Sequence, residues 1–166
     1  MKIVAGVMGP GAMATQADCD DAFEIGRLIA GEGWVTLTGG RRAGVMEAAL
    51  RGARAAGGVT IGILPHDDHD GDISPFVDVP ILTGLGEARN VINVLTSAVV
   101  FVCGASAGTA SEIALALRLE RPTLLVNPSP ASLQFWKTIE SPCLYVARSP
   151  ADAVNQAVAL VSVPRR

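Results

Sequence analysis

Three glycine-rich segments of this chain contain the residue types that hold anions. They are Gly9-Pro10-Gly11, residues 38–44 and residues 104–109, and each lies between a short apolar run and a helical pattern. The first N–H groups of a helix have no partner inside the helix, and the helix dipole attracts negative charge. Glycine allows a ligand to approach such a turn closely. The three turns therefore predict backbone donors for a phosphate or another anionic group.

Polar side chains in the same segments can add to these donors. Arg41 and Arg42 follow a pair of glycines and can form charge-assisted hydrogen bonds with phosphate oxygens. The alternative is that both are solvated, since charged side chains in loops mostly face water. In the third turn we expect free N–H groups at Gly108 and Thr109, and the Thr109 hydroxyl offers one more donor.

The first turn formally matches the dinucleotide motif G-x-G-x-x-A over residues 9–14. Two features argue against NAD. Thr15 and Asp18 have the spacing of a capping box, which starts the helix after the motif. The second strand ends at Thr38, where dinucleotide-binding proteins need an acidic residue for the ribose. We therefore expect neither NAD nor NADP, and a plain tight turn explains this segment as well as a phosphate contact does.

The segment 66–72, His-Asp-Asp-His-Asp-Gly-Asp, contains both histidines of the chain. Imidazole and carboxylate side chains can bind divalent metals. The segment follows Pro65, however, and charged loops are mostly solvated, so we expect a flexible, solvated loop and no metal ligands. Cys103 ends an apolar run just before the third turn, which favours a buried small side chain over a reactive thiolate.

The elements that would position these turns alternate along the chain. Seven short apolar runs predict strands at residues 3–8, 34–38, 59–64, 77–82, 98–103, 123–126 and 143–147. Helical patterns lie between them, and the clearest spans residues 16–31. Most of the strands are apolar throughout, which is typical of a parallel sheet covered by helices on both faces. The sequence therefore predicts an α/β, Rossmann-like, doubly wound fold with a mainly parallel sheet of about seven strands.

Length and composition fit one domain over residues 1–166. The formal net charge of -3 and the aromatic content of 4% disfavour a nucleic-acid partner. Three widely spaced cysteines fit neither a disulfide framework nor a zinc cluster, so we expect a reducing cytoplasm. No apolar run approaches the roughly 20 residues that span a bilayer, so we expect no membrane partner.

The order of the motifs along the chain is also informative. The second and third turns, with the segments 62–65 (Gly-Ile-Leu-Pro) and 83–90 (Thr-Gly-Leu-Gly-Glu-Ala-Arg-Asn) between them, resemble the molybdenum cofactor carrier proteins. The resemblance runs from Gly9 to about Asn127. It implies a protein that binds, protects and delivers the molybdenum cofactor, a phosphate-bearing pterin. It also implies a homo-oligomer, dimer or tetramer, and a molybdoenzyme as acceptor.

More distantly, the chain resembles the cytokinin-activating phosphoribohydrolases, which have a PGGxGTxxE turn and an upstream arginine. Gly108, Thr109 and Glu112 fit the GTxxE part of that turn, and Arg89 fits the arginine. Residues 104–106 depart from it, because Gly-Ala-Ser stands in place of Pro-Gly-Gly. This change adds side chains beside the expected ligand, and it counts against hydrolysis more than against binding.

The second turn departs from the enzymes in a similar way, since Arg41 replaces the third glycine of their GGGxxGLMG motif. In a hydrolase of this kind, Glu112 would stabilise the oxocarbenium character of the sugar while Arg89 fixes the phosphate or ribose. The ordinary alternatives are a carboxylate that serves the helix dipole for Glu112 and a surface ion pair for Arg89.

We therefore favour an anion-binding protein over an enzyme and keep two alternatives. One is a phosphoribohydrolase that releases the base from a nucleoside 5′-monophosphate, with Arg89 and Glu112 as catalytic residues. The other is a nucleotide-sensing module. The expected ligand contacts are Gly9, Pro10, Gly11, Thr38, Gly39, Gly40, Arg41, Arg42, Gly44, Arg89, Asn90, Gly104, Ala105, Ser106, Ala107, Gly108, Thr109 and Glu112.

Overall fold

The computed structural model describes residues 2–68 and 72–162, and these form one seven-stranded sheet. Neighbouring strands pair in parallel in the order β4-β3-β2-β1-β5-β6-β7. The predicted α/β fold is therefore confirmed. The strands are β1 (Val4–Met8), β2 (Val35–Thr38), β3 (Thr60–Leu64), β4 (Val79–Leu82), β5 (Val99–Cys103), β6 (Thr123–Val126) and β7 (Leu144–Ala147).

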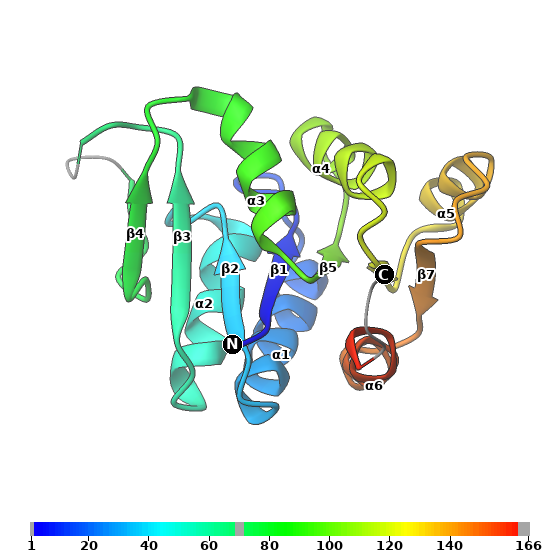
Figure 1. Ribbon diagram of the computed structural model, residues 1–166, viewed down its shortest axis with the longest axis horizontal. Coiled ribbons are helices and arrows are strands. Elements are labelled where there is room, and N and C mark those ends of the chain that lie inside the picture. The colour runs from blue at the N-terminus through cyan, green and yellow to red at the C-terminus, as the bar shows by residue number, and fades with distance from the viewer. Residues whose placement is uncertain (1, 69–71, 163–166) are drawn as a thin grey trace.

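The helices lie on both faces of this sheet, as a doubly wound fold requires (Figure 1). They are α1 (Gln16–Gly31), α2 (Gly44–Ala55), α3 (Asn90–Thr96), α4 (Ala107–Arg118), α5 (Pro130–Lys137) and α6 (Pro150–Val161), with the 3-10 helix η1 (Gly86–Arg89) before α3. One core cluster joins the sheet to α1, α2 and α6, and the other joins it to α3, α4 and α5. Alternate strand residues supply the two clusters, because successive side chains of a strand point to opposite faces.

The first helix begins where the capping signal places it, at Gln16. The Asp18 N–H donates to Thr15 Oγ1 at 3.1 Å, and the Thr15 N–H donates to Asp18 Oδ2 at 2.9 Å. Both bonds of a capping box are thus present. The glycine turn at Gly9 to Gly11 therefore lies wholly before the helix, and it passes over the carboxyl end of β1.

Helices α1 and α2 pack against each other at unusually short range. A Cβ on Gly52 of α2 would overlap the Phe23 carbonyl oxygen of α1, and a Cβ on Gly26 of α1 would overlap the Ala49 carbonyl oxygen of α2. Each helix therefore uses a glycine to let the backbone of the other approach. Their contact keeps the glycine turn before α2 next to the turn before α1.

The predicted strand at 77–82 is shorter in the structure, where β4 begins at Val79. The Val77 N–H donates to the Ser74 carbonyl oxygen at 3.2 Å, which keeps this residue in a turn. β4 is an edge strand and contains Pro80, which has no N–H to offer a further strand. Among the described residues, no helix has the length and apolar character that crossing a membrane requires.

The charged segment between β3 and β4 is only partly described, since residues 69–71 lie outside the described range. His66, Asp67 and Asp68 are exposed, as expected of a solvated loop. The end of this segment at Asp72, however, is held by a hydrogen bond. The Arg42 N–H donates to the Asp72 carbonyl oxygen at 2.9 Å, so this end of the segment is paired with the second glycine turn.

Candidate functional site

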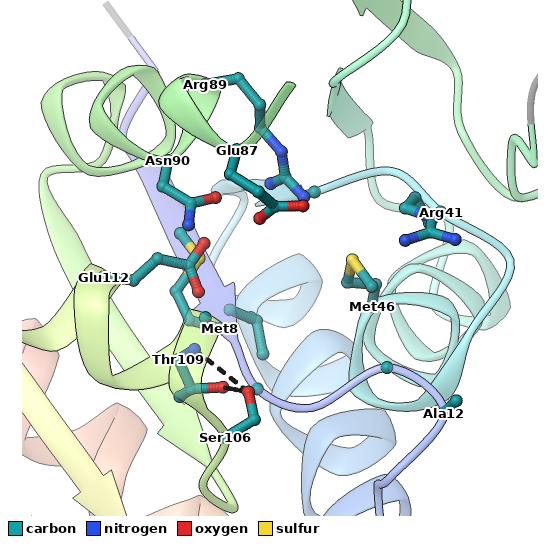
Figure 2. Close-up of a pocket in the computed structure, with 15 residues that line it drawn as sticks. Met8, Ala12, Arg41, Met46, Glu87, Arg89, Asn90, Ser106, Thr109 and Glu112 are labelled. Carbon is teal, nitrogen blue, oxygen red and sulfur yellow. Dashed lines mark hydrogen bonds between the residues drawn. The ribbon is translucent and has the colours of Figure 1, made fainter. Parts of the chain in front are cut away.

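A cavity of about 220 Å³ lies at the carboxyl edge of the sheet, where the strand order reverses between β1 and β5. Ligands of open α/β folds bind at such a switch point. Arg89 and Glu87 project into the cavity from η1, Glu112 projects from α4, and Arg41 and Met46 form the opposite wall (Figure 2). The lining residues are Val7, Met8, Gly9, Gly11, Ala12, Gly39, Arg41, Met46, Glu87, Arg89, Asn90, Ser106, Gly108, Thr109 and Glu112.

Arg89 is the buried cation of this cavity, with only 6% of its surface exposed. Its guanidinium rests on Gly39, where a Cβ would overlap Nη1. Burial lowers the pKa of Arg89, and the charges of Glu112 and Glu87 act in the opposite direction. Within the described residues, Arg89 forms no salt bridge, and its buried Nε has no hydrogen-bond partner. The guanidinium is thus a desolvated positive charge without a direct salt-bridge partner among these residues, although the charges of Glu112 and Glu87 act on it.

Glu112 is the buried carboxyl group of the same cavity and is 7% exposed. Burial raises its pKa to about 7, although a hydrogen bond from Asn93 and the charge of Arg89 lower it. The Asn93 Nδ2 donates to Glu112 Oε1 at 2.8 Å. Near neutral pH, Glu112 is therefore present in both its charged and its neutral form.

Two of the amide donors at the glycine turns are used within the protein. The Thr109 N–H donates to Ser106 Oγ at 3.2 Å, because Ser106 caps α4. The Ser106 and Thr109 hydroxyls also share a hydrogen bond of 2.8 Å (Figure 2). The Gly40 N–H donates to Thr38 Oγ1 at 3.0 Å. The expectation of a free Thr109 N–H was therefore wrong, since a side-chain cap satisfies it.

The two arginines of the second turn differ in position. Arg41 lines the cavity, and its Nη2 lies 3.6 Å from Asp72 Oδ2. Its Nε is buried and has no hydrogen-bond partner among the described residues. Arg42 is exposed and does not line the cavity. Arg41 is thus the second cation near the site, although Asp72 already offsets part of its charge.

The cavity brings together residues from all three predicted turns. The predicted residues that line it are Gly9, Gly11, Gly39, Arg41, Arg89, Asn90, Ser106, Gly108, Thr109 and Glu112. The predicted residues that do not line it are Pro10, Thr38, Gly40, Arg42, Gly44, Gly104, Ala105 and Ala107.

Gly104 and Ala105 line a neighbouring cavity of about 310 Å³. Gly104 has a φ of 78° and lies so close to α1 that a Cβ there would sit 2.6 Å from Asp18 Cγ. Such a φ is open to glycine and costly for other residues. The start of the third turn therefore faces α1, whereas its end faces the first cavity.

Some lining residues were not predicted from the sequence. Met8 and Met46 have apolar side chains that the periodicity places in the core. Glu87 belongs to a segment that the family resemblance singled out, but no residue-level argument gave it a role. Asn93 lies just beneath the cavity, fully buried. A polar amide three residues after Asn90, within a stripe of apolar positions, was the available signal.

No metal site accompanies this cavity in residues 2–68 and 72–162, where no cluster of three or more histidine, cysteine, aspartate or glutamate residues could hold an ion. His69, from the segment considered for metal binding, lies outside those ranges. Cys103 is fully buried, and burial raises the pKa of its thiol well above the usual value. The interpretation of Cys103 as a core residue is confirmed.

Fold and site together define a Rossmann-like α/β protein whose cavity, at the reversal of strand order, contains a buried arginine. The sequence model of the SLOG cluster4 family matches residues 2–154, and the chain belongs to this family. The structure is similar to that of the molybdenum cofactor binding protein of Rippkaea orientalis, with a TM-score of 0.94 and 46% identity over 97% of this chain and 98% of the other.

Two further comparisons agree with this assignment. The molybdenum cofactor carrier protein of Chlamydomonas reinhardtii superposes with a TM-score of 0.92 at 41% identity, covering 98% of this chain and 100% of that chain. A shorter match links the chain to the cytokinin riboside 5′-monophosphate phosphoribohydrolase of Mycobacterium tuberculosis. It is 41% identical over 58 residues and covers 31% of each protein. The family resemblance read from the motifs is therefore confirmed.

Proposed function

We propose that this protein binds the molybdenum cofactor in the switch-point cavity, protects it and delivers it to an acceptor molybdoenzyme. The observation that carries the proposal is Arg89, a buried guanidinium that lines the cavity without a salt-bridge partner in the described part of the chain. A desolvated cation without a direct salt-bridge partner favours an anionic ligand. The two solved carrier and binding proteins described above support the choice of this anion.

The cavity is lined by cationic, apolar and acidic side chains, which fits an anionic cargo that also has a flat apolar part. Arg89 and Arg41 can bind a phosphate or an oxo-metal group, while Met8 and Met46 offer apolar contact to a flat ring. Glu87 and Glu112 are carboxylic acids, and an ionised carboxylate would repel the phosphate. The cargo would therefore place its phosphate towards the arginines and a neutral donor towards Glu112.

Ligand identification tests this proposal. The protein is purified anaerobically, and the bound small molecules are identified by mass spectrometry. The same preparation, freed of ligand, is then titrated with molybdenum cofactor and with AMP. We expect the cofactor to bind more tightly than AMP and to be released intact. A preference for AMP, or failure to bind the cofactor, would overturn the proposal.

The second candidate function is hydrolysis of a nucleoside 5′-monophosphate. One observation favours it: Arg89 and Glu112, the two residues that the resemblance assigns to such an enzyme, line the same cavity and are both buried. In that reaction Glu112 would stabilise the developing sugar cation as a carboxylate. Release of adenine from AMP by the wild type, and its loss in Glu112→Gln, would establish this activity.

The proposed carrier is a homo-oligomer that works in a reducing cytoplasm. Cys19, Cys103 and Cys143 are free thiols, which suits a reducing compartment. An apolar groove between α3 and α4 supports self-association, since Val91 and Leu115 line it and Leu95 nearby is 50% exposed.

A further inference from the structure

Asn93 is a buried polar residue that the proposed function leaves without a role. It lies on α3, is fully buried, and donates from Nδ2 to Glu112 Oε1 at 2.8 Å. The same Nδ2 lies 3.9 Å from Met8 Sδ. Its Oδ1 is also buried and has no hydrogen-bond partner in the described part of the chain. The Ser97 hydroxyl donates to the Asn93 carbonyl oxygen at 2.7 Å and holds the backbone in place.

An amide in this position can serve both charge states of Glu112. When Glu112 is ionised, the Asn93 Nδ2 donates to it, as the structure shows. When Glu112 is protonated, the Asn93 amide can flip by about 180°, so that Oδ1 accepts a hydrogen bond from the carboxyl O–H. An aspartate at position 93 would repel ionised Glu112, and a leucine there would form a hydrogen bond with neither form. The unpartnered Oδ1 is thus the acceptor that the neutral carboxyl group requires.

The charges that face Glu112 make its proton affinity sensitive to a ligand. Arg89 and Glu87, both on η1, act on it directly, and Arg41 of the second turn acts on Arg89. An anion in the cavity would repel an ionised Glu112 and would also offset the charge of Arg89. Both effects favour the protonated carboxyl group, so they add rather than cancel.

We propose that Asn93 is a positioning residue that holds Glu112 in either charge state, and that an anion entering this cavity is taken up together with up to one proton, which Glu112 binds to the extent that it was ionised beforehand. The proton comes from water or buffer and leaves when the anion leaves. This inference rests on the proposed function only in taking the cargo to be anionic. It adds a chemical condition for release, since a rise in pH weakens the hold on the cargo.

The first test needs no cargo. Glutamate carboxyl groups are labelled with ¹³C, and the Glu112 resonance is followed over pH in the wild type, in Asn93→Leu and in Thr36→Val. We expect the Glu112 midpoint to rise by about one pH unit in Asn93→Leu, because the charge-assisted hydrogen bond that the ionised form loses is stronger than the bond that the neutral form loses. Thr36→Val is the matched control, since it alters another fully buried polar residue, on β2. An unchanged midpoint in Asn93→Leu would overturn the positioning role.

The same titration of the wild type, with and without inorganic phosphate, keeps the inference testable if Asn93→Leu does not fold. We expect phosphate to raise the Glu112 midpoint. In a further arm, the Kd for molybdenum cofactor is measured from about pH 6 to about pH 9. The wild-type Kd should rise by up to about tenfold per pH unit above the Glu112 midpoint. Glu112→Gln should lack this part of the slope, although the phosphate of the cargo still titrates.

The outcomes separate the two proposals. If the wild type binds the cofactor and Glu112→Gln keeps the full pH slope, the proton inference is wrong and the carrier function stands. If the wild type does not bind the cofactor, the carrier function is wrong. The phosphate titration then decides the proton inference by itself, and an unmoved Glu112 midpoint would overturn it.

Discussion

At the scale of single residues, the site depends on a buried cation, Arg89, and a buried acid, Glu112, which do not form a salt bridge with each other. No salt bridge between Arg89 and Glu112 is present in the described structure, although both line the same cavity. Each is kept from water by the fold, which costs free energy in the absence of a ligand. Two predictions follow from these two costs.

The first concerns the stability of the ligand-free protein against pH. Glu112 has a raised pKa of about 7 against an ordinary value of 4.5, so the folded state binds this proton more tightly than the unfolded state. The contribution of Glu112 to stability is complete below pH 4.5, falls as pH rises, and is lost above about pH 7. The loss is on the order of 3 kcal/mol. The free energy of unfolding of the wild type and of Glu112→Gln is measured with denaturant at pH 5 and at pH 8. The wild type should lose more of this free energy between the two pH values than the variant does. Equal losses would mean that Glu112 has an ordinary pKa.

The second prediction concerns Arg89→Gln. Removal of an unpaired buried charge should leave the free energy of unfolding unchanged or higher. Affinity for the anionic cargo should fall by about 30-fold or more, because a buried charge partner of about 2 kcal/mol is lost. Arg42→Gln is the control, since Arg42 belongs to the second turn but is exposed and outside the cavity. Calorimetric titration with molybdenum cofactor distinguishes the two variants. Equal losses in both would point to general attraction rather than a site at Arg89.

At this scale the sequence was informative about residue types and less so about their partners. Arg89 and Glu112 came from the family resemblance, and both line the cavity. Thr109 was expected to offer a free N–H, but Ser106 occupies it. Serine before a helix signals a cap, so the sequence carried both interpretations and could not rank them. Asn93 was missed because burial beside an acid is a tertiary property.

At the scale of elements, the closest packing in the described structure is that of α1 against α2, and it yields the third prediction. Gly52→Ala should destabilise the protein by about 2 kcal/mol or more, because the new Cβ meets the backbone of Phe23 and the helices must separate. Helix propensity alone would predict the opposite sign.

Gly31→Ala is the matched control for this prediction. Gly31 is the last residue of α1, and a Cβ there would meet nothing within 4 Å. This variant should stabilise the protein by up to about 1 kcal/mol. Thermal and denaturant unfolding of both variants provides the measurement. Stabilisation by Gly52→Ala would show that the helices part without cost.

The elements themselves were the most predictable part of the molecule. Strands buried on both faces read as apolar runs, and the β1, β2, β3, β5, β6 and β7 boundaries fall within one residue of the expected ones. The exception is β4, an edge strand that begins two residues later than expected, since the Val77 N–H bonds to Ser74 in the preceding turn. Edge strands lack the two-sided burial that makes the pattern clear.

At the scale of the whole molecule, the sequence predicts the fold class. It does not predict that the glycine turns at the carboxyl edge of the sheet line two neighbouring cavities. Alternating strands and helices predict a doubly wound sheet, and glycine turns predict ligands at its carboxyl edge. Whether three turns share one cavity depends on the strand order and on how α1 crosses that edge. Gly104 and Ala105 face α1 and the neighbouring cavity for this reason.

The fourth prediction concerns assembly. If a second copy covers the apolar groove between α3 and α4, Val91→Glu should lower the mass of the particle in solution, because a charge would be buried at the contact. Phe135→Glu is the control, since Phe135 is 58% exposed on α5, away from that groove. Light scattering after size-exclusion chromatography measures both. A monomeric wild type would overturn the proposed oligomer, and an oligomer of unchanged mass in Val91→Glu would place the interface on another surface.

The central position of β1 has a consequence for the order of folding. β1 pairs with β2 on one side and with β5 on the other, and β5 follows β1 by more than half of the chain. As the chain leaves the ribosome, the segment from β1 to β3 can assemble from local contacts, while the other edge of β1 waits for a distant strand. That edge is then an open, wholly apolar template. Newly made chains are therefore exposed to mispairing with one another until β5 arrives, and early chaperone binding to this half should raise the yield of folded protein.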